Sequence, residues 1–294
     1  MCTLLRSEVS MLKVEQLVFQ YGKTGTKALK GIDFDIRDGE VFGFLGPSGS
    51  GKTTTQRVLI GLLRGYQGRV EVFGKERSSW GRDYFERIGV AFDFPNLYLK
   101  LTAYENLKVI GGYYKNQCSD PDALLESVGL LPYRDQKVEG FSKGMKMRLN
   151  FIRSLLHDPD LLFFDEPTSG LDPVNAKVIK DIILDLKIRG KTIFLTTHNM
   201  TVAEQLCDRV AFLVDGSIPV CGSPEALKRQ YGKKTIRVTY MEDEQESASE
   251  FPMERGKASQ DLIEVIKSHE IKTIHSQEAT LEDIFIRLTG RELV

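Results

Sequence analysis

A glycine-rich loop between an apolar strand and a helix constrains this chain more than any other feature. The stretch "EVFGFLGPSGSGKTTT" reads as a buried strand, a tight loop and the start of a helix. Residues 46–53 fit the pattern G-x-x-x-x-G-K-[ST] at every fixed position. In such a loop the backbone curls so that successive amides face phosphate groups. The lysine adds positive charge, and the hydroxyl of the serine or threonine that follows it can bind Mg²⁺. A chance glycine-rich turn is the alternative, but the flanking strand and helix favour a phosphate site.

The loop supplies the first set of expected ligands. We expect Lys52 to contact the β- and γ-phosphates of a nucleotide and to act in catalysis, and we expect the Thr53 hydroxyl to bind Mg²⁺. The residues expected to contact the nucleotide here are Gly46, Pro47, Ser48, Gly49, Ser50, Gly51, Lys52, Thr53 and Thr54.

A second apolar strand ends in two carboxylates. The run "LLFF" leads directly into Asp165 and Glu166. Ligands of open α/β sheets bind at the carboxyl ends of the strands. We therefore expect Asp165 to hold the Mg²⁺ shell and Glu166 to orient or deprotonate the attacking water. A carboxylate pair after an apolar run is often only a strand end that meets solvent, but the phosphate loop favours the functional interpretation.

A third strand, "KTIFLTTH", ends at His198. A lone histidine is more often a hydrogen-bonded structural residue than a catalytic one. This one follows a β-rich run of the right length to lie beside the carboxylate strand, so we expect it to contact the γ-phosphate and to position water.

A second, weaker anion site is expected at "FSKGMKMRL", residues 141–149. Ser142 can cap a helix, Gly144 keeps the backbone open, and the amides of the first turn point outward. These features make half of an anion site in a chain that already has a complete phosphate loop.

Composition excludes several classes of protein. The formal net charge is −1, which is not typical of a nucleic-acid-binding protein, and we expect no nucleic-acid partner. The 4 cysteines are scattered, which is typical of a reducing cytosol and not of a disulfide framework. The longest apolar runs are too short to cross a bilayer, so the sequence predicts a soluble chain.

Taken in order, these parts resemble the nucleotide-binding subunit of ABC transporters. The phosphate loop, "FSKGMK", "LLFFDEP", "SGLD" and His198 follow one another as in that family. The resemblance implies two such domains facing head to tail, so that Ser142 and Gly144 reach the γ-phosphate of ATP bound to a partner. It further implies that Tyr21 stacks on adenine, although a strand-end aromatic is often only core, and that Asp172 links the two sites.

Three positions depart from the family pattern. Asp93 stands where the family usually has glutamine. The resemblance implies that the side chain at this position binds Mg²⁺ or positions water, and a carboxylate can also bind Mg²⁺. Lys143 stands in place of glycine, and Met145 in place of glutamine.

The expected fold is α/β, with a P-loop NTPase core, an antiparallel β subdomain, a helical subdomain that contains "FSKGMK", which resembles the family's signature sequence, and a small α+β extension. The expected boundaries are 12–231 for the ATPase domain, about 95–158 for the helical subdomain and 232–294 for the extension. Beyond Tyr231 the sequence predicts the strands "TIRVTY" and "IKTIHS" and the helices "DLIEVIKSH" and "TLEDIFIRLTG", with a polar, acidic connection over residues 241–256.

The resemblance implies an ATP-hydrolysing subunit that uses ATP and Mg²⁺ and energises transport through a separate membrane permease. The extension, with its ending "TLEDIFIRLTG", resembles that of ATPase subunits of multidrug and antibiotic exporters, which favours an exporter. The expected partners are that permease, which would contact the aromatic stretch Phe94–Tyr98, and a second copy or a related ATPase subunit. The chain would be cytoplasmic, peripheral on the inner face of the cell membrane. A soluble ABC ATPase that remodels an assembly is the alternative, and a nucleotide-binding adaptor without turnover is a third class.

Overall fold

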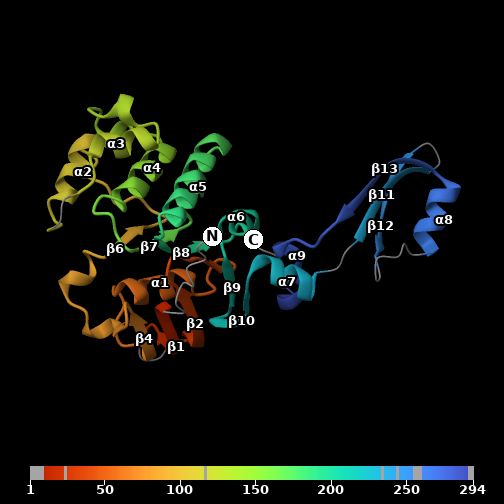
Figure 1. Cartoon of the computed structure of the whole chain (residues 1–294), viewed down its shortest axis with the longest axis horizontal. Helices are drawn as coiled ribbons and strands as arrows, with labels where there is room; N and C mark the ends of the chain where they lie inside the picture. The colour runs from red at the N-terminus through yellow and green to blue at the C-terminus, as the bar shows by residue number, and fades with distance from the viewer. Residues whose placement is uncertain are drawn as a thin grey trace, which may run out of the picture. The chain divides into compact units, whose positions relative to one another are not determined.

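The computed structural model describes residues 10–22, 25–115, 118–232, 235–242, 245–253 and 260–290. The chain folds into two compact units, of which the first ends at Cys221 and the second begins at Gly222 (Figure 1). The domain boundary expected after Tyr231 stays a prediction. Within the described ranges, none of the helices combines the length and the hydropathy that a membrane span requires.

A six-stranded sheet forms the centre of the first unit, in the order β10-β9-β3-β8-β7-β6. β3 pairs in parallel with β8 and β9, and β7 pairs in parallel with β6 and β8. Every residue of β3, β7 and β8 is buried, as expected for parallel strands covered on both faces. The carboxyl ends of β3, β6, β7 and β8 therefore meet at one edge. The strands are β3 (Val41–Leu45), β6 (Ile88–Ala91), β7 (Leu161–Asp165), β8 (Thr192–Thr197), β9 (Arg209–Val214) and β10 (Ser217–Gly222).

A second, antiparallel sheet has the order β2-β1-β4-β5, which confirms the expected β subdomain. Its apolar face joins the parallel sheet in one core. The Phe34 ring of β2 lies 5.2 Å from that of Phe44 on β3 and 6.2 Å from that of Phe194 on β8. The strands are β1 (Ser10–Gln20), β2 (Lys27–Arg37), β4 (Gln67–Val72) and β5 (Lys75–Glu76).

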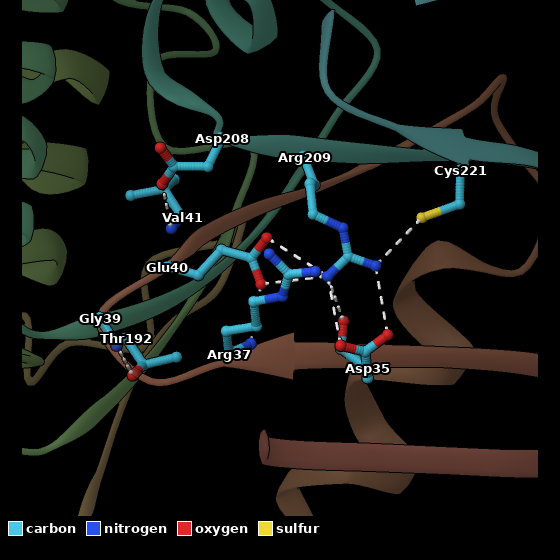
Figure 2. Close-up of polar contacts among 9 residues, drawn as sticks. All are labelled: Asp35, Arg37, Gly39, Glu40, Val41, Thr192, Asp208, Arg209 and Cys221. Atoms are coloured by element: carbon cyan, nitrogen blue, oxygen red, sulfur yellow. Dashed lines mark hydrogen bonds and ion pairs between the residues drawn. The ribbon is translucent and has the colours of Figure 1, made fainter. Parts of the chain in front are cut away.

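A polar network joins the two sheets near the amino-terminal ends of β3 and β9 (Figure 2). The Arg209 guanidinium of β9 lies 3.2 Å from an Asp35 oxygen of β2 and 3.4 Å from an oxygen of the buried Glu40. Glu40 also accepts a 2.7 Å hydrogen bond from the Arg37 amide. Burial raises the pKa of Glu40, against the neighbouring Arg37 amide and Arg209 charge. One guanidinium thus connects the two sheets on the side away from the strand ends that carry the predicted site.

Helices of the first unit fall into two groups. Three helices each follow a strand of the parallel sheet: α1 (Lys52–Ile60) follows β3, α5 (Pro173–Ile188) follows β7 and α6 (Met200–Leu206) follows β8. Three others gather on the β6–β7 side of the sheet: α2 (Ala103–Gly111), α3 (Pro121–Ser127) and α4 (Lys143–Arg153) (Figure 1). Thr102 and Glu105 start α2 with a reciprocal capping box. Short 3₁₀ turns lie at Arg77–Ser79, Arg82–Tyr84, Leu131–Tyr133 and Val138–Gly140.

The second unit has a three-stranded antiparallel sheet in the order β12-β11-β13, with a small core of Val238, Tyr240, Phe251 and Leu262. The strands and helices predicted here from the sequence are confirmed, but the prediction of an irregular acidic connection over residues 241–256 is wrong in its middle. β12 forms there, because pairing with β11 and burial of Phe251 outweigh the low strand propensity of its acidic and serine residues. The elements are α7 (Pro224–Tyr231), β11 (Thr235–Glu242), β12 (Gln245–Pro252), α8 (Gln260–Ser268), β13 (Glu270–Gln277) and α9 (Leu281–Thr289).

Candidate functional site

The phosphate loop connects the buried strand β3 to α1, and two glycines explain its path. A Cβ on Gly46 would lie 2.2 Å from the Leu213 carbonyl oxygen, so no larger residue fits there. Gly51 precedes α1 with φ +113°, a conformation that glycine adopts without strain. It offers no side-chain cap, so the amides of the first turn of α1 stay directed at the loop, as in anion-binding helix starts. Ser48 and Gly49 are exposed at the outer turn.

The Lys52 ammonium lies inside the loop. Its Nζ donates to the carbonyl oxygens of Gly46 at 2.6 Å and Pro47 at 3.0 Å. Burial lowers the pKa of Lys52, and the negative charges of Glu166 and Asp165 oppose that change. The Ser50 hydroxyl is buried in the same loop and has no hydrogen-bond partner. An anion in the loop would give the Ser50 hydroxyl a partner and the Lys52 ammonium a counter-charge.

Asp165 ends β7 in a buried position. Its Oδ1 accepts a hydrogen bond from the Thr196 hydroxyl of β8, whereas its Oδ2 is buried and has no hydrogen-bond partner. Burial raises the pKa of Asp165, and the negative charges of Asp93 and Glu166 act in the same direction, against the Thr196 hydrogen bond and the Lys52 charge. An unpartnered buried carboxylate oxygen fits a position that a cation completes.

Glu166 follows in a left-handed backbone conformation with φ +49°, and its carboxylate contacts the end of β8. Its Oε2 accepts from the Thr197 hydroxyl at 3.1 Å. Its Oε1 accepts from the His198 amide at 2.9 Å and lies 2.7 Å from His198 Nδ1. The structure therefore brings Glu166 and His198 together as the sequence suggested, and the His198 ring stays 57% exposed.

Asp93 lies in the loop that follows β6, at the same sheet edge. It is exposed, and its charge reaches Asp165, so the structure places the two carboxylates near each other. Within the part of the chain that the structure describes, no three His, Cys, Asp or Glu side chains could hold a metal by themselves. Any Mg²⁺ would therefore take ligands from Thr53, phosphate oxygens or water as well as from these carboxylates.

Tyr21 is 47% exposed at the end of β1, so it is not a core residue. Its hydroxyl lies 3.1 Å from the Thr54 hydroxyl of α1, and its ring meets that of Phe19 edge-on at 5.0 Å. These contacts hold an accessible aromatic ring beside the first turn of α1.

Ser142 caps α4 by accepting a 3.2 Å hydrogen bond from the Met145 amide. The start of α4 lies against the "SGLD" segment: a Cβ on Gly144 would be 3.5 Å from Leu171, and one on Gly170 would be 3.3 Å from Lys143 Nζ. Asp172 caps α5 through the amides of Val174 and Asn175, each at 3.0 Å. Ser142, Gly144 and Asp172 thus form a second surface, distinct from the carboxylates around Lys52.

Two functional positions escaped the sequence reasoning. Thr196 and Thr197 hold the carboxylates of Asp165 and Glu166, one each. The signal was visible in "FLTTH", because two hydroxyls at the end of a buried strand have few other partners than neighbouring strand ends.

The chain is similar to known proteins in sequence and in structure. A family model described as ABC transporter matches residues 29–169. A fluoroquinolones export ATP-binding protein of Mycobacterium tuberculosis is 50% identical over 289 residues, which cover 98% of this chain and 96% of that protein. A Nod factor export ATP-binding protein of Burkholderia lata is 36% identical over 284 residues, covering 90% and 93%.

Solved structures show the same architecture. The ATP-binding subunit of an ABC transporter superimposes with a TM-score of 0.68 and 28% identity, covering 76% of this chain and 93% of that one. A dimeric ATP-binding cassette in a post-hydrolysis state, bound to ADP and phosphate, has a TM-score of 0.66 and 26% identity, covering 72% and 98%.

Proposed function

The chain belongs to the ABC transporter family as an ATP-binding ATPase subunit, and on that premise we propose that it energises export through a separate membrane permease. The observation that carries the proposal is the juxtaposition of the Lys52 loop, Asp165 and the hydrogen-bonded pair Glu166 and His198 at one sheet edge. The relatives at 50% and 36% identity are both named as export ATP-binding proteins, which supports the direction of transport.

For ATP binding, we assign the phosphates to the amides of the loop and of the first turn of α1. The Lys52 ammonium would exchange its two carbonyl partners for phosphate oxygens, which are stronger acceptors because they are charged. The Tyr21 ring would stack on the adenine, since it is exposed and held beside α1.

For hydrolysis, Glu166 orients the attacking water and accepts its proton. Thr197 and His198 fix the carboxylate in place, so that little reorganisation is needed at the moment of reaction. While its Nδ1–H donates to Glu166, the His198 ring can also donate to the γ-phosphate only from Nε2, and therefore only as the imidazolium.

Mg²⁺ fits this site, because Asp165 Oδ2 is buried and lacks a partner. We propose Thr53, Asp165 and Asp93 as its protein ligands, directly or through water. When bound, the ion would offset phosphate charge and hold the β- and γ-oxygens in place.

We propose that a second copy, or a related subunit, completes each site with Ser142 and Gly144. The start of α4 presents free amides and a small residue, and α4 has no acidic residue in its first turn. Head-to-tail pairing would give these amides the γ-phosphate of the facing ATP as their ligand.

We propose that the permease docks on an apolar hollow between the loop that carries Asp93 and the first turn of α4. Residues 93–99 line a cavity of about 850 Å³ together with Ile110, Lys143 and Lys146. Phe94 is 71% exposed, and Tyr98 and Leu99 are exposed as well. An apolar helical segment of a membrane partner suits such a groove, and the chain would then be peripheral on the cytoplasmic face.

Two measurements test the proposal. Purified protein should hydrolyse ATP in the presence of Mg²⁺, and Glu166→Gln should bind ATP without turnover. In the native host, Lys52→Ala should raise the intracellular concentration of an exported drug, with a fluoroquinolone as the first probe. Turnover without any change in drug accumulation across a panel of compounds would favour a soluble remodelling ATPase over an exporter.

A further inference from the structure

One face of α4 is turned toward the loop of residues 92–98, which carries Asp93. Lys143, Lys146, Asn150 and Arg153 recur at spacings of three or four residues, so they lie on one side of the helix. The first two line the apolar hollow opposite the loop. The last two bond to the loop directly.

The bonds join side chains of α4 to backbone carbonyls of the loop. Asn150 Nδ2 donates to the Phe92 oxygen at 2.9 Å, next to Asp93 in the chain. Arg153 Nη1 donates to the Asn96 oxygen. The loop and the helix therefore line the hollow together and are joined by two hydrogen bonds, at the carbonyls of Phe92 and Asn96.

Asn150 is 1% exposed, and its Oδ1 is buried without a hydrogen-bond partner. Burying an amide with half of its capacity unused costs stability compared with an apolar residue of the same shape. Among the described residues, the hydrogen bond to the loop is the only side-chain hydrogen bond of Asn150 that offsets this cost.

We propose that Asn150 is a positioning residue, which makes the 92–98 loop move with the signature helix and so sets the distance between Asp93 and Asp165. This inference rests on the proposed function. Ser142 begins the same helix, so a partner's ATP that engages Ser142 would also draw Asp93 into place in the chain's own site. Asn150 thereby couples the two nucleotide sites of the dimer.

The test is a double-mutant cycle between Asn150→Leu and Asp93→Ala. Leucine keeps the number and branching of the side-chain heavy atoms and removes both the donor and the unpaired oxygen, so the fold should tolerate it. Ser154→Ala is the matched control, because Ser154 is the C-cap of α4 and its buried hydroxyl donates to Phe151 of that helix at 2.6 Å, not to the loop.

The first readout is amide hydrogen exchange in the nucleotide-free protein, which requires no turnover. Asn150→Leu should speed exchange of the amides of Asp93, Phe94, Asn96 and Leu97 by about tenfold, as expected for one lost hydrogen bond, and Ser154→Ala should not. Equal exchange in Asn150→Leu and wild type would overturn the proposal.

The second readout is Mg²⁺-dependent ATP turnover. Asn150→Leu and Asp93→Ala should each lower kcat about five- to tenfold with KM for ATP within about twofold, and the double variant should fall no further than Asp93→Ala alone. Multiplicative losses, or an Asp93→Ala variant with normal kcat, would overturn the proposal. An inactive wild type would contradict the proposed function alone, because the exchange comparison would still report whether Asn150 holds the loop.

Discussion

Glu166 and His198 are joined twice: Glu166 Oε1 accepts from the His198 amide at 2.9 Å and lies 2.7 Å from the ring Nδ1. The backbone bond depends only on the fold, whereas the ring bond depends on the side chain. Substitution of His198 therefore removes one of the two bonds and leaves the other.

His198→Ala should lower turnover about 100-fold, because the ring holds Glu166 and, in the proposed function, also contacts the γ-phosphate. Thr197→Val removes only the 3.1 Å bond to Oε2 and should lower kcat about fivefold, the effect of one neutral hydrogen bond. Steady-state ATPase assays with a parallel measurement of ATP affinity would show this. Equal losses in the two variants would mean that His198 only orients the carboxylate.

Glu166→Gln should convert the protein from monomer to dimer when Mg-ATP is added, because blocked hydrolysis would leave ATP bound between the two paired subunits. Adding Ser142→Arg should abolish the dimer by filling the phosphate position at the start of α4. Ser223→Arg is the control, since Ser223 caps α7 with the same 3.2 Å geometry and loses a comparable bond. Solution mass by light scattering decides the outcome, and a dimer that survives Ser142→Arg would contradict the shared site.

Asp165→Asn should stabilise the nucleotide-free protein at neutral pH. Because burial raises the folded pKa of Asp165, the native state binds more protons than the unfolded state above about pH 4, and stability falls as pH rises toward the raised pKa. Asparagine removes that loss. The Tm of Asp165→Asn minus the Tm of wild type should therefore grow from pH 4 upward and then level off. Each 1 kcal/mol of stability corresponds to a Tm change of about 2–4 °C. Thermal unfolding without Mg²⁺ measures it.

The opposite sign is expected at Asp172. Hydrogen bonds from Asn175 and Val174 lower the pKa of Asp172, so its charged form adds stability that is lost as pH falls through the lowered pKa. Asp172→Asn should therefore be most destabilising at neutral pH. The same pH trend in both variants would refute the explanation.

Arg209→Met should destabilise the first unit by about 3 kcal/mol, because it removes the cation that is paired with the buried Glu40 carboxylate. Adding Glu40→Gln should recover part of that loss, since the uncompensated charge disappears. Arg189→Met is the control: its pair with Asp185 is exposed and should contribute less than about 0.5 kcal/mol. Urea unfolding provides the comparison, and similar losses for both arginines would contradict it.

Much of the architecture could be predicted because it depends on local pattern. The phosphate loop, the buried runs ending at Asp165 and His198, and the capping residues Thr102 and Thr280 each act within a few residues of chain. The strand β12 could not be predicted, because its polar residues have little strand propensity and form a strand through pairing with β11.

By itself, the sequence determined which chemical groups are present and which strand end each follows: Lys52, Asp165, Glu166 and His198 all lie where parallel strands meet one edge. Tertiary structure alone decided how those groups are held. Thr196 and Thr197 hold the two carboxylates, Asn150 holds the loop of Asp93, and Arg209 connects two sheets. These partners are 31 to 174 positions apart, and a hydrogen bond depends on distances of a few tenths of an ångström that only packing sets.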